Sequence, residues 1–392
     1  MKHHLLLAVL IIAGMVLSAC GGMTSFTCTD PLGCVTIGSG ESIKIATLLT
    51  MSGTNKPYGV DAERGVEIAI ADAGNLLGHK IELVQADDQC DAKAGEAAAA
   101  QLAADKQIVG VIGATCSSVS VLAAKTISDA GMVLISPSST APSLTDPHLH
   151  QAGFFRAIYN DKAQGKAVAE FAYNVLGLRR MLTFHDGTAY PEQLQQTACD
   201  SFEALGGRCV DQVNLSTYPD VLGDLRTTAA DNPDVIYFPV YIKDGVNIVQ
   251  AVPHSLENGA VMISSDGLLS KDFIQQTEPA SDGMYLSGPA PVSESQTFVQ
   301  KYKARYGEDP IAAYHLQGYD AANMLFHAIQ QAAQVSGNKL YIPRQKLRDA
   351  LYKIHGIQGL STMITCSPNG DCAQPNIEIF QIVNNDFKPV YP

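Results

Sequence analysis

Two hydroxyl-rich turns hold the residues of this chain that are best suited to chemistry. The first, Gly-Ala-Thr-Cys-Ser-Ser at 113–118, follows the strand-like run 108–112 and opens a helical pattern. The first backbone N–H groups of a helix lack partners within it, so such a start suits a carboxylate. The second turn, Ser-Pro-Ser-Ser-Thr at 136–140, follows the apolar run 132–135. If the two strands are neighbours in a parallel sheet, both turns lie at its carboxyl edge, where open α/β sheets bind ligands.

The elements around these turns repeat along the chain. From residue 43, apolar runs at 43–49, 81–86, 108–112 and 132–135 alternate with helical periodicity at 60–73, 92–106 and 118–130, and the pattern restarts at 163–176 and 180–184. Repeated βαβ units predict parallel sheets and an α/β fold. Removing 41 N-terminal residues from 392 leaves 351, which exceeds what one core usually serves, so two lobes are expected.

The N-terminus has the features of an export signal. Lys2 precedes an apolar run at 5–17 that ends in Leu-Ser-Ala-Cys, which predicts a signal peptide over residues 1–19. That ending resembles a bacterial lipobox, which implies lipidation of Cys20 and membrane attachment through lipid alone. Residues 20–41 are rich in Gly, Ser and Thr and are interpreted as a lipidated tether.

Charge and cysteine content restrict the class of protein. The net charge is 26 − 39 = −13, which argues against nucleic acid as a partner. Nine cysteines minus Cys20 leave eight, an even number that favours disulfides over metal or redox chemistry in an exported protein. Eight thiols permit many connectivities. The prediction is nearest-neighbour pairing: Cys28 with Cys34, Cys90 with Cys116, Cys199 with Cys209, and Cys366 with Cys372.

Four segments resemble a known family. Asp-Asp-Gln-Cys-Asp at 87–91, Cys-Ser-Ser at 116–118, the run 131–140 and Phe-Phe-Arg at 154–156 resemble the periplasmic leucine/isoleucine/valine-binding proteins of ABC transporters, which are type I periplasmic binding proteins. The resemblance extends more weakly from about residue 43 to the C-terminus. It implies two Rossmann-like lobes joined by a three-segment hinge, with 42–157 and 288–357 in lobe 1 and 158–287 and 358–392 in lobe 2.

The resemblance also implies roles for three residues of lobe 1. Ser117 would bind a ligand α-carboxylate through its N–H and hydroxyl, and Thr140 would bind the same group. Ser138 would accept from the α-ammonium through its backbone carbonyl. Each has a structural alternative: Ser117 is also a good helix N-cap, and serine and threonine are common in turns.

Lobe 2 would complete the site. Asp266 stands where the family places an acid for the ammonium, usually glutamate, and Tyr241 matches a tyrosine that contacts the amino group. Tyr58 and Tyr190 would wall the side-chain pocket. An Asp-Gly turn and solvent-exposed tyrosines are the structural alternatives.

The expected function is that of an exported solute-binding lipoprotein, in the periplasm or on the outer face of the cytoplasmic membrane. It would capture a branched-chain or related apolar amino acid between its lobes and deliver it to an ABC permease, as a monomer, without cofactor, metal or catalysis. A ligand-sensing subunit for a separate receptor and a secreted serine hydrolase are the alternatives. No G-x-S-x-G motif supports the hydrolase.

Overall fold

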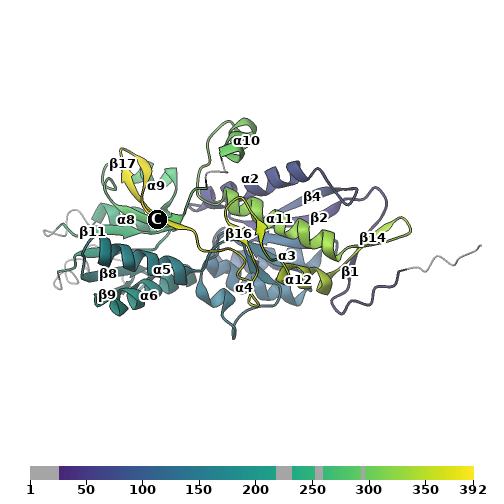
Figure 1. Cartoon of the computed structure of the whole chain (residues 1–392), viewed down its shortest axis with the longest axis horizontal. Helices are drawn as coiled ribbons and strands as arrows, with labels where there is room; N and C mark the ends of the chain where they lie inside the picture. Colours follow the sequence, from purple (N-terminus) through teal and green to yellow (C-terminus); the bar gives the residue numbers. More distant parts are fainter. Residues whose placement is uncertain (1–25, 218–231, 252–258, 293–295) are drawn as a thin grey trace, which may run out of the picture.

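The computed structural model describes residues 26–217, 232–251, 259–292 and 296–392. The predicted signal peptide and Cys20 lie outside these ranges. Two α/β lobes lie side by side along the long axis of the molecule (Figure 1), which confirms the predicted fold class. No helix within the described ranges is long and apolar enough to cross a membrane.

Lobe 1 is built on a six-stranded sheet of order β3-β4-β2-β5-β6-β7, parallel except where β3 meets β4. Its strands are β2 (Ile43–Leu49), β3 (Asn75–Leu76), β4 (His79–Asp87), β5 (Ile108–Gly113), β6 (Leu134–Ser136) and β7 (Phe154–Arg156). Its helices are α2 (Lys56–Ala73), α3 (Ala92–Ala104), α4 (Ser117–Asp129), η2 (Pro142–Thr145), α10 (Gln296–Tyr306), α11 (His315–Ala332) and α12 (Arg344–Tyr352).

Both faces of this sheet are apolar, so each face is buried under a layer of helices. Ile43 and Ile45 of β2 pack in one cluster with α2, α11 and α12. Ala46 and Leu48 of the same strand pack in another cluster with α3 and α4. The carboxyl edge of the parallel strands is left for the turns that face lobe 2.

Lobe 2 has a seven-stranded sheet of order β18-β17-β12-β11-β10-β8-β9, in which β17 and β18 are antiparallel additions. Its strands are β8 (Arg180–His185), β9 (Arg208–Asn214), β10 (Val235–Tyr237), β11 (Val261–Ser264), β12 (Tyr285–Pro289), β17 (Ile377–Val383) and β18 (Asp386–Tyr391). Its helices are α5 (Asp161–Glu170), η3 (Phe171–Val175), α6 (Ala189–Ala204), α8 (Ile242–Ala251), η6 (Asp266–Leu268) and α9 (Lys271–Thr277). α5 and α6 cover one face, while α8 and α9 cover the other.

The segment interpreted as a tether is partly a strand of lobe 1. β1 (Cys34–Ile37) pairs with β14 (Lys339–Pro343), which also pairs with β13 (Gln334–Ser336). Phe26 packs on the ring of Tyr341 at 4.4 Å between centroids. Val35 and Ile37 are buried in the lobe 1 core. Their alternation with polar residues therefore marks a strand, although the segment around them has the composition of a polar linker.

Three chain segments cross between the lobes. They follow β7, β12 and the small hairpin of β15 (Ile357–Gln358) and β16 (Met363–Ile364), which Figure 1 shows near the junction. The third crossing comes later than the predicted lobe boundary between residues 357 and 358, because Ile364 and Cys372 still pack in the lobe 1 core. Backbone bonds join Arg156 to Gly370 and Cys372, so the chain leaves lobe 1 only after Cys372.

All eight cysteines within the described ranges form the four predicted nearest-neighbour disulfides. The Cys366–Cys372 loop packs on lobe 1, although the range predicted for lobe 2, 358–392, contains it.

Gly65 of α2 and Gly318 of α11 allow these two helices to pack closely. A Cβ on Gly318 would lie 2.2 Å from the Ala62 carbonyl oxygen, so Gly318→Ala must force the helix backbones apart. We expect the free energy of unfolding, measured by chemical denaturation, to fall by about 1–3 kcal/mol. Gly38→Ala is the control, because its Cβ would meet only the flexible Glu41 side chain and should change stability by less than about 0.5 kcal/mol. Equal denaturation midpoints for the two variants would contradict this reading of the helix contact.

Candidate functional site

The two hydroxyl-rich turns lie together at the carboxyl edge of the lobe 1 sheet. Ser117 is the first residue of α4 and is buried, and its Oγ accepts from the Ala141 N–H at 3.2 Å. The Ser138 hydroxyl donates to the Thr115 carbonyl at 2.8 Å, so this side chain holds the turns together. The Thr140 hydroxyl is fully buried and has no hydrogen-bond partner in the described part of the chain. A carboxylate at this edge would meet helix N–H groups and an unpaired hydroxyl.

Asp88 fixes the first turn from behind. Its carboxylate accepts from the Thr50 hydroxyl, from the Cys90 N–H at 2.9 Å and from the Thr115 N–H at 3.0 Å. The Cys90–Cys116 disulfide ties the same turn to the residues after β4. Burial raises the pKa of Asp88, and these hydrogen bonds offset only part of that rise.

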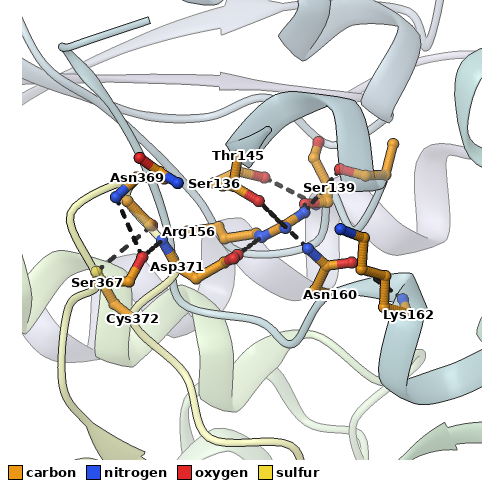
Figure 2. Close-up of polar contacts among 12 residues, drawn as sticks. Ser136, Ser139, Thr145, Arg156, Asn160, Lys162, Ser367, Asn369, Asp371 and Cys372 are labelled. Atoms are coloured by element: carbon orange, nitrogen blue, oxygen red, sulfur yellow. Dashed lines mark hydrogen bonds and ion pairs between the residues drawn. The ribbon is translucent and has the colours of Figure 1, made fainter. Parts of the chain in front are cut away.

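Arg156 fixes the second turn. Figure 2 shows its side chain extending from Asp371 to the turn that contains Ser139. The guanidinium is fully buried and donates to Asp371 Oδ1 at 2.5 Å, to the Ser139 and Ala141 carbonyls at 3.2 and 3.0 Å, and to Thr145 Oγ1 at 2.5 Å. The planar fork of an arginine can reach acceptors on several sides at once. This one joins the binding turn to the first hinge segment and to the Cys366–Cys372 loop.

In lobe 2, Asp266 is the centre of the opposing surface. It is 1 % exposed, and its carboxylate accepts from Gln164 Nε2 at 2.9 Å, the Tyr190 hydroxyl at 2.7 Å and the Tyr314 hydroxyl at 2.9 Å. Burial raises the pKa of Asp266, and these three donors oppose the shift. Tyr314 comes from lobe 1, so one of the three bonds crosses the cleft.

Other direct contacts also join the lobes. The Tyr58 hydroxyl of lobe 1 donates to the Gly267 carbonyl of lobe 2 at 2.5 Å. At the rim, Gln193 of α6 exchanges two hydrogen bonds of 2.9 Å with Ser143. The cavity left between the lobes is about 10 Å³, lined by Tyr58, Thr115, Ser138, Tyr190, Tyr241 and Tyr314. The lobes are therefore closed on each other, with room for about one water molecule.

A second acid, Asp161, lies beside this site. It is the first residue of α5, its carboxylate is fully buried, and neither oxygen meets a hydrogen-bond partner within the described ranges. Burial and the charge of Asp266 raise the pKa of Asp161 well above its usual range, and the nearby Thr140 hydroxyl and the charge of Arg156 oppose this shift only partly. The hydroxyls of Tyr159 and Tyr237 are likewise buried without partners in the described structure. The cluster can accept a cation that donates hydrogen bonds.

Of the seven predicted ligand-binding residues, four line the cavity between the lobes: Tyr58, Ser138, Tyr190 and Tyr241. Ser117, Thr140 and Asp266 are buried and do not line it. The tyrosine rings of 190 and 241 pack at 5.3 Å, and Tyr58 packs edge-on against Tyr314 at 5.7 Å. Sequence reasoning missed Asp161, Gln164 and Tyr314. Asp161 follows Asn160, whose side chain caps α5, so in sequence it resembles an ordinary acid in a first helical turn. Tyr314 had no signal, because it precedes a helix and meets Asp266 only through the fold.

Comparison with known proteins places the chain in context. A family model described as periplasmic binding protein matches residues 42–386. An amino acid binding protein of Pseudomonas aeruginosa is 28% identical over 294 residues, covering 72% of this chain and 76% of its own length. A Leu/Ile/Val-binding protein homolog of Brucella suis is 28% identical over 301 residues, covering 74% of this chain and 77% of its own.

A solved structure agrees with these sequence matches. The crystal structure of the leucine binding protein LivK from Thermotoga maritima superposes with a TM-score of 0.80 and 26% identity. The match covers 89% of this chain and 97% of the other. The overall fold is therefore shared.

The Arg156 network gives a first prediction for the site. In Arg156→Lys, a single ammonium cannot reach the four acceptors, so buried carbonyls are left unpaired. We expect the free energy of unfolding to fall by roughly 3 kcal/mol in chemical denaturation. Asp371→Asn is the matched variant; it removes only the ion pair to a one-third exposed partner and should cost clearly less. Equal losses would assign the effect to the ion pair and not to the turn.

A second prediction concerns the buried acid. Because the pKa of Asp161 is raised by folding, its ionisation makes the ligand-free fold less stable as pH rises above the ordinary aspartate pKa near about 4. We expect Asp161→Asn to raise the free energy of unfolding at pH 7 by at least about 1 kcal/mol, and the gain to vanish on titration toward pH 4.

The control is Asp129→Asn, since Asp129 is exposed and pairs with Lys125 at 2.6 Å. Its stability should change by less than about 0.5 kcal/mol. A destabilised Asp161→Asn protein at pH 7 would show that the native fold requires the Asp161 charge.

Proposed function

The chain belongs to the periplasmic binding protein family, and from this membership we propose that it captures an α-amino acid between its lobes and delivers it to an ABC permease. Ligand capture by closure of the two lobes, without catalysis, is the proposed activity. The protein would act outside the cytoplasm, held to a membrane by lipid on Cys20. Its relatives are named for binding amino acids, including leucine, isoleucine and valine.

The single observation that carries the proposal is the opposite chemistry of the two sides of the cleft. On one side, the start of α4 and the unpaired Thr140 hydroxyl offer donors to an anion. On the other side, Asp266 is a buried carboxylate that forms no ion pair within the described ranges. The buried carboxylate of Asp161 lies next to Thr140, whose carbonyl accepts from the Asp161 N–H at 3.0 Å. Buried charges require pairing, so an ammonium is the natural counterpart. A zwitterion supplies both groups at once.

The roles follow from position. Ser117 and Thr140 would bind the α-carboxylate, and the Ser138 carbonyl, Asp161, Asp266 and Tyr241 would bind the α-ammonium. Tyr58 and Tyr190 would enclose the side chain. A branched-chain apolar side chain can pack against the tyrosine rings. This choice of ligand also agrees with the name of the Leu/Ile/Val-binding relative. A carboxylate without an ammonium, such as benzoate, would leave both acids unpaired.

Binding has to replace the direct contacts between the lobes. The ammonium would take the place of the Tyr314 hydroxyl on Asp266, and the ligand would then hold the two lobes together. A permease or a sensor protein would recognise that ligand-bound closed form. Both partners require the same amino acid complex, so binding assays test the site independently of the partner.

Calorimetry with leucine, isoleucine, valine and benzoate tests the proposal, because only an ampholyte satisfies both sides of the cleft. We expect Asp266→Ala to weaken leucine binding by well over tenfold, since a charged hydrogen-bond partner is lost. Asp272→Ala removes an exposed acid from the same region and should leave the dissociation constant unchanged. Unchanged leucine affinity in Asp266→Ala, or benzoate binding as tight as leucine binding, would reject the ammonium assignment.

A further inference from the structure

A second cavity lies between the lobes, away from the tyrosine-lined site. It has a volume of about 310 Å³. Lobe 2 contributes Leu269 to Lys271 and the C-terminal hairpin residues Phe380 and Phe387, and lobe 1 contributes residues 310–313 and 315–317 with Val299. The hinge segment at Pro289 to Pro291 closes one side. All three parts of the molecule must be in their present positions for this cavity to exist.

The lining is mainly apolar, and its polar members are Ser270, Lys271, His315 and Gln317. Leu269, Phe380 and Leu316 are less than a tenth exposed, and the imidazole of His315 is already bound to Asp61 at 2.9 Å. Gln317 is 4 % exposed, and its Oε1 has no hydrogen-bond partner within the part of the chain that is described. Gln317 lines both this cavity and a smaller one of about 10 Å³. A buried amide oxygen without a partner costs free energy until a donor reaches it.

We propose that this cavity is a second ligand site, specific for a neutral monocyclic aromatic molecule with one O–H or N–H donor. An apolar cavity of about 150 Å³ is enough to hold benzene, so 310 Å³ admits a substituted ring. The ring contacts the phenylalanine and aliphatic lining, and its donor binds Gln317 Oε1. A charged group finds no buried partner of opposite charge in the lining, since Lys271 is exposed, so the site favours a neutral ligand.

The second site is coupled to the amino acid site through shared walls. The chain passes from Asp266 in the first site to Leu269 in the second within one short turn, and Tyr314 lies between cavity residues Ala313 and His315. In the proposed amino acid complex the ammonium replaces the Tyr314 hydroxyl on Asp266 while the lobes stay closed, and closed lobes are the arrangement that forms this cavity. A molecule that requires this arrangement stabilises it and raises amino acid affinity, and the coupling must be reciprocal.

Benzyl alcohol and anisole are isomers of which only the alcohol has a donor, so they form a matched pair of probes. Saturation-transfer NMR on the purified protein, without amino acid, should show benzyl alcohol binding more tightly than anisole by on the order of five-fold. In Gln317→Met, which keeps the length of the side chain but has no amide, the two probes should bind equally. Ala312→Phe fills the cavity and should abolish binding of both.

These measurements involve no amino acid, so their failure is separate from failure of the proposed function. Absence of benzyl alcohol binding, or binding unchanged in Ala312→Phe, overturns the second site. A second arm measures leucine affinity with and without saturating benzyl alcohol, and we expect affinity to rise a few-fold in wild type and not in Ala312→Phe. Displacement of benzyl alcohol by leucine would place the probe in the amino acid cleft and overturn the proposal, and unchanged leucine affinity would overturn the coupling.

Discussion

The site depends on two buried carboxylates, those of Asp161 and Asp266, which form no ion pair within the described residues. Asp161 and Asp266 are both about fully buried, and each raises the pKa of its neighbours. Three donors surround Asp266, whereas none meets Asp161 within the described residues. The site therefore holds an electrostatic imbalance that a hydrophobic core would not contain. Such an imbalance is costly in the ligand-free fold and becomes favourable only when a cation arrives, which is how a binding site exchanges stability for affinity.

The rest of lobe 1 supports that site from behind. Asp88 and Arg156 do not line the cavity, yet each binds the backbone of a turn that does. Because Arg156 also contacts Asp371, the same guanidinium links the binding turn to the hinge and to a disulfide loop. The binding turn and the hinge are therefore both held by one buried group, the Arg156 guanidinium. A lysine has too few directed donors to do this, which explains why the residue type matters even though it touches no ligand.

The sequence predicted what local patterns encode. The strand at 43–49 has the predicted bounds because a local apolar run defines it, and the disulfides were predictable because each joins near neighbours in sequence. The β1, β13 and β14 sheet was not predicted, because β1 finds its partner some 300 residues away. Asp161 and Tyr314 were missed for a related reason: one resembles a capping acid, and the other reaches Asp266 only across the cleft. Family resemblance supplied Asp266, Tyr190 and Tyr241, which composition and spacing alone could not have selected from among many turns.

The direct contacts between the lobes have a consequence for affinity. Tyr58 bonds Gly267 and Tyr314 bonds Asp266 across a cleft that has space for about one water molecule. An amino acid must break at least the second of these bonds, so its measured affinity is the difference between the contacts it makes and those it displaces. The displaced bond is a neutral donor on a carboxylate, and an ammonium on the same carboxylate is a stronger, charge-assisted contact. The site should therefore select a zwitterion over a neutral solute of the same shape. Only an ammonium forms a contact with Asp266 that is stronger than the Tyr314 hydrogen bond it displaces.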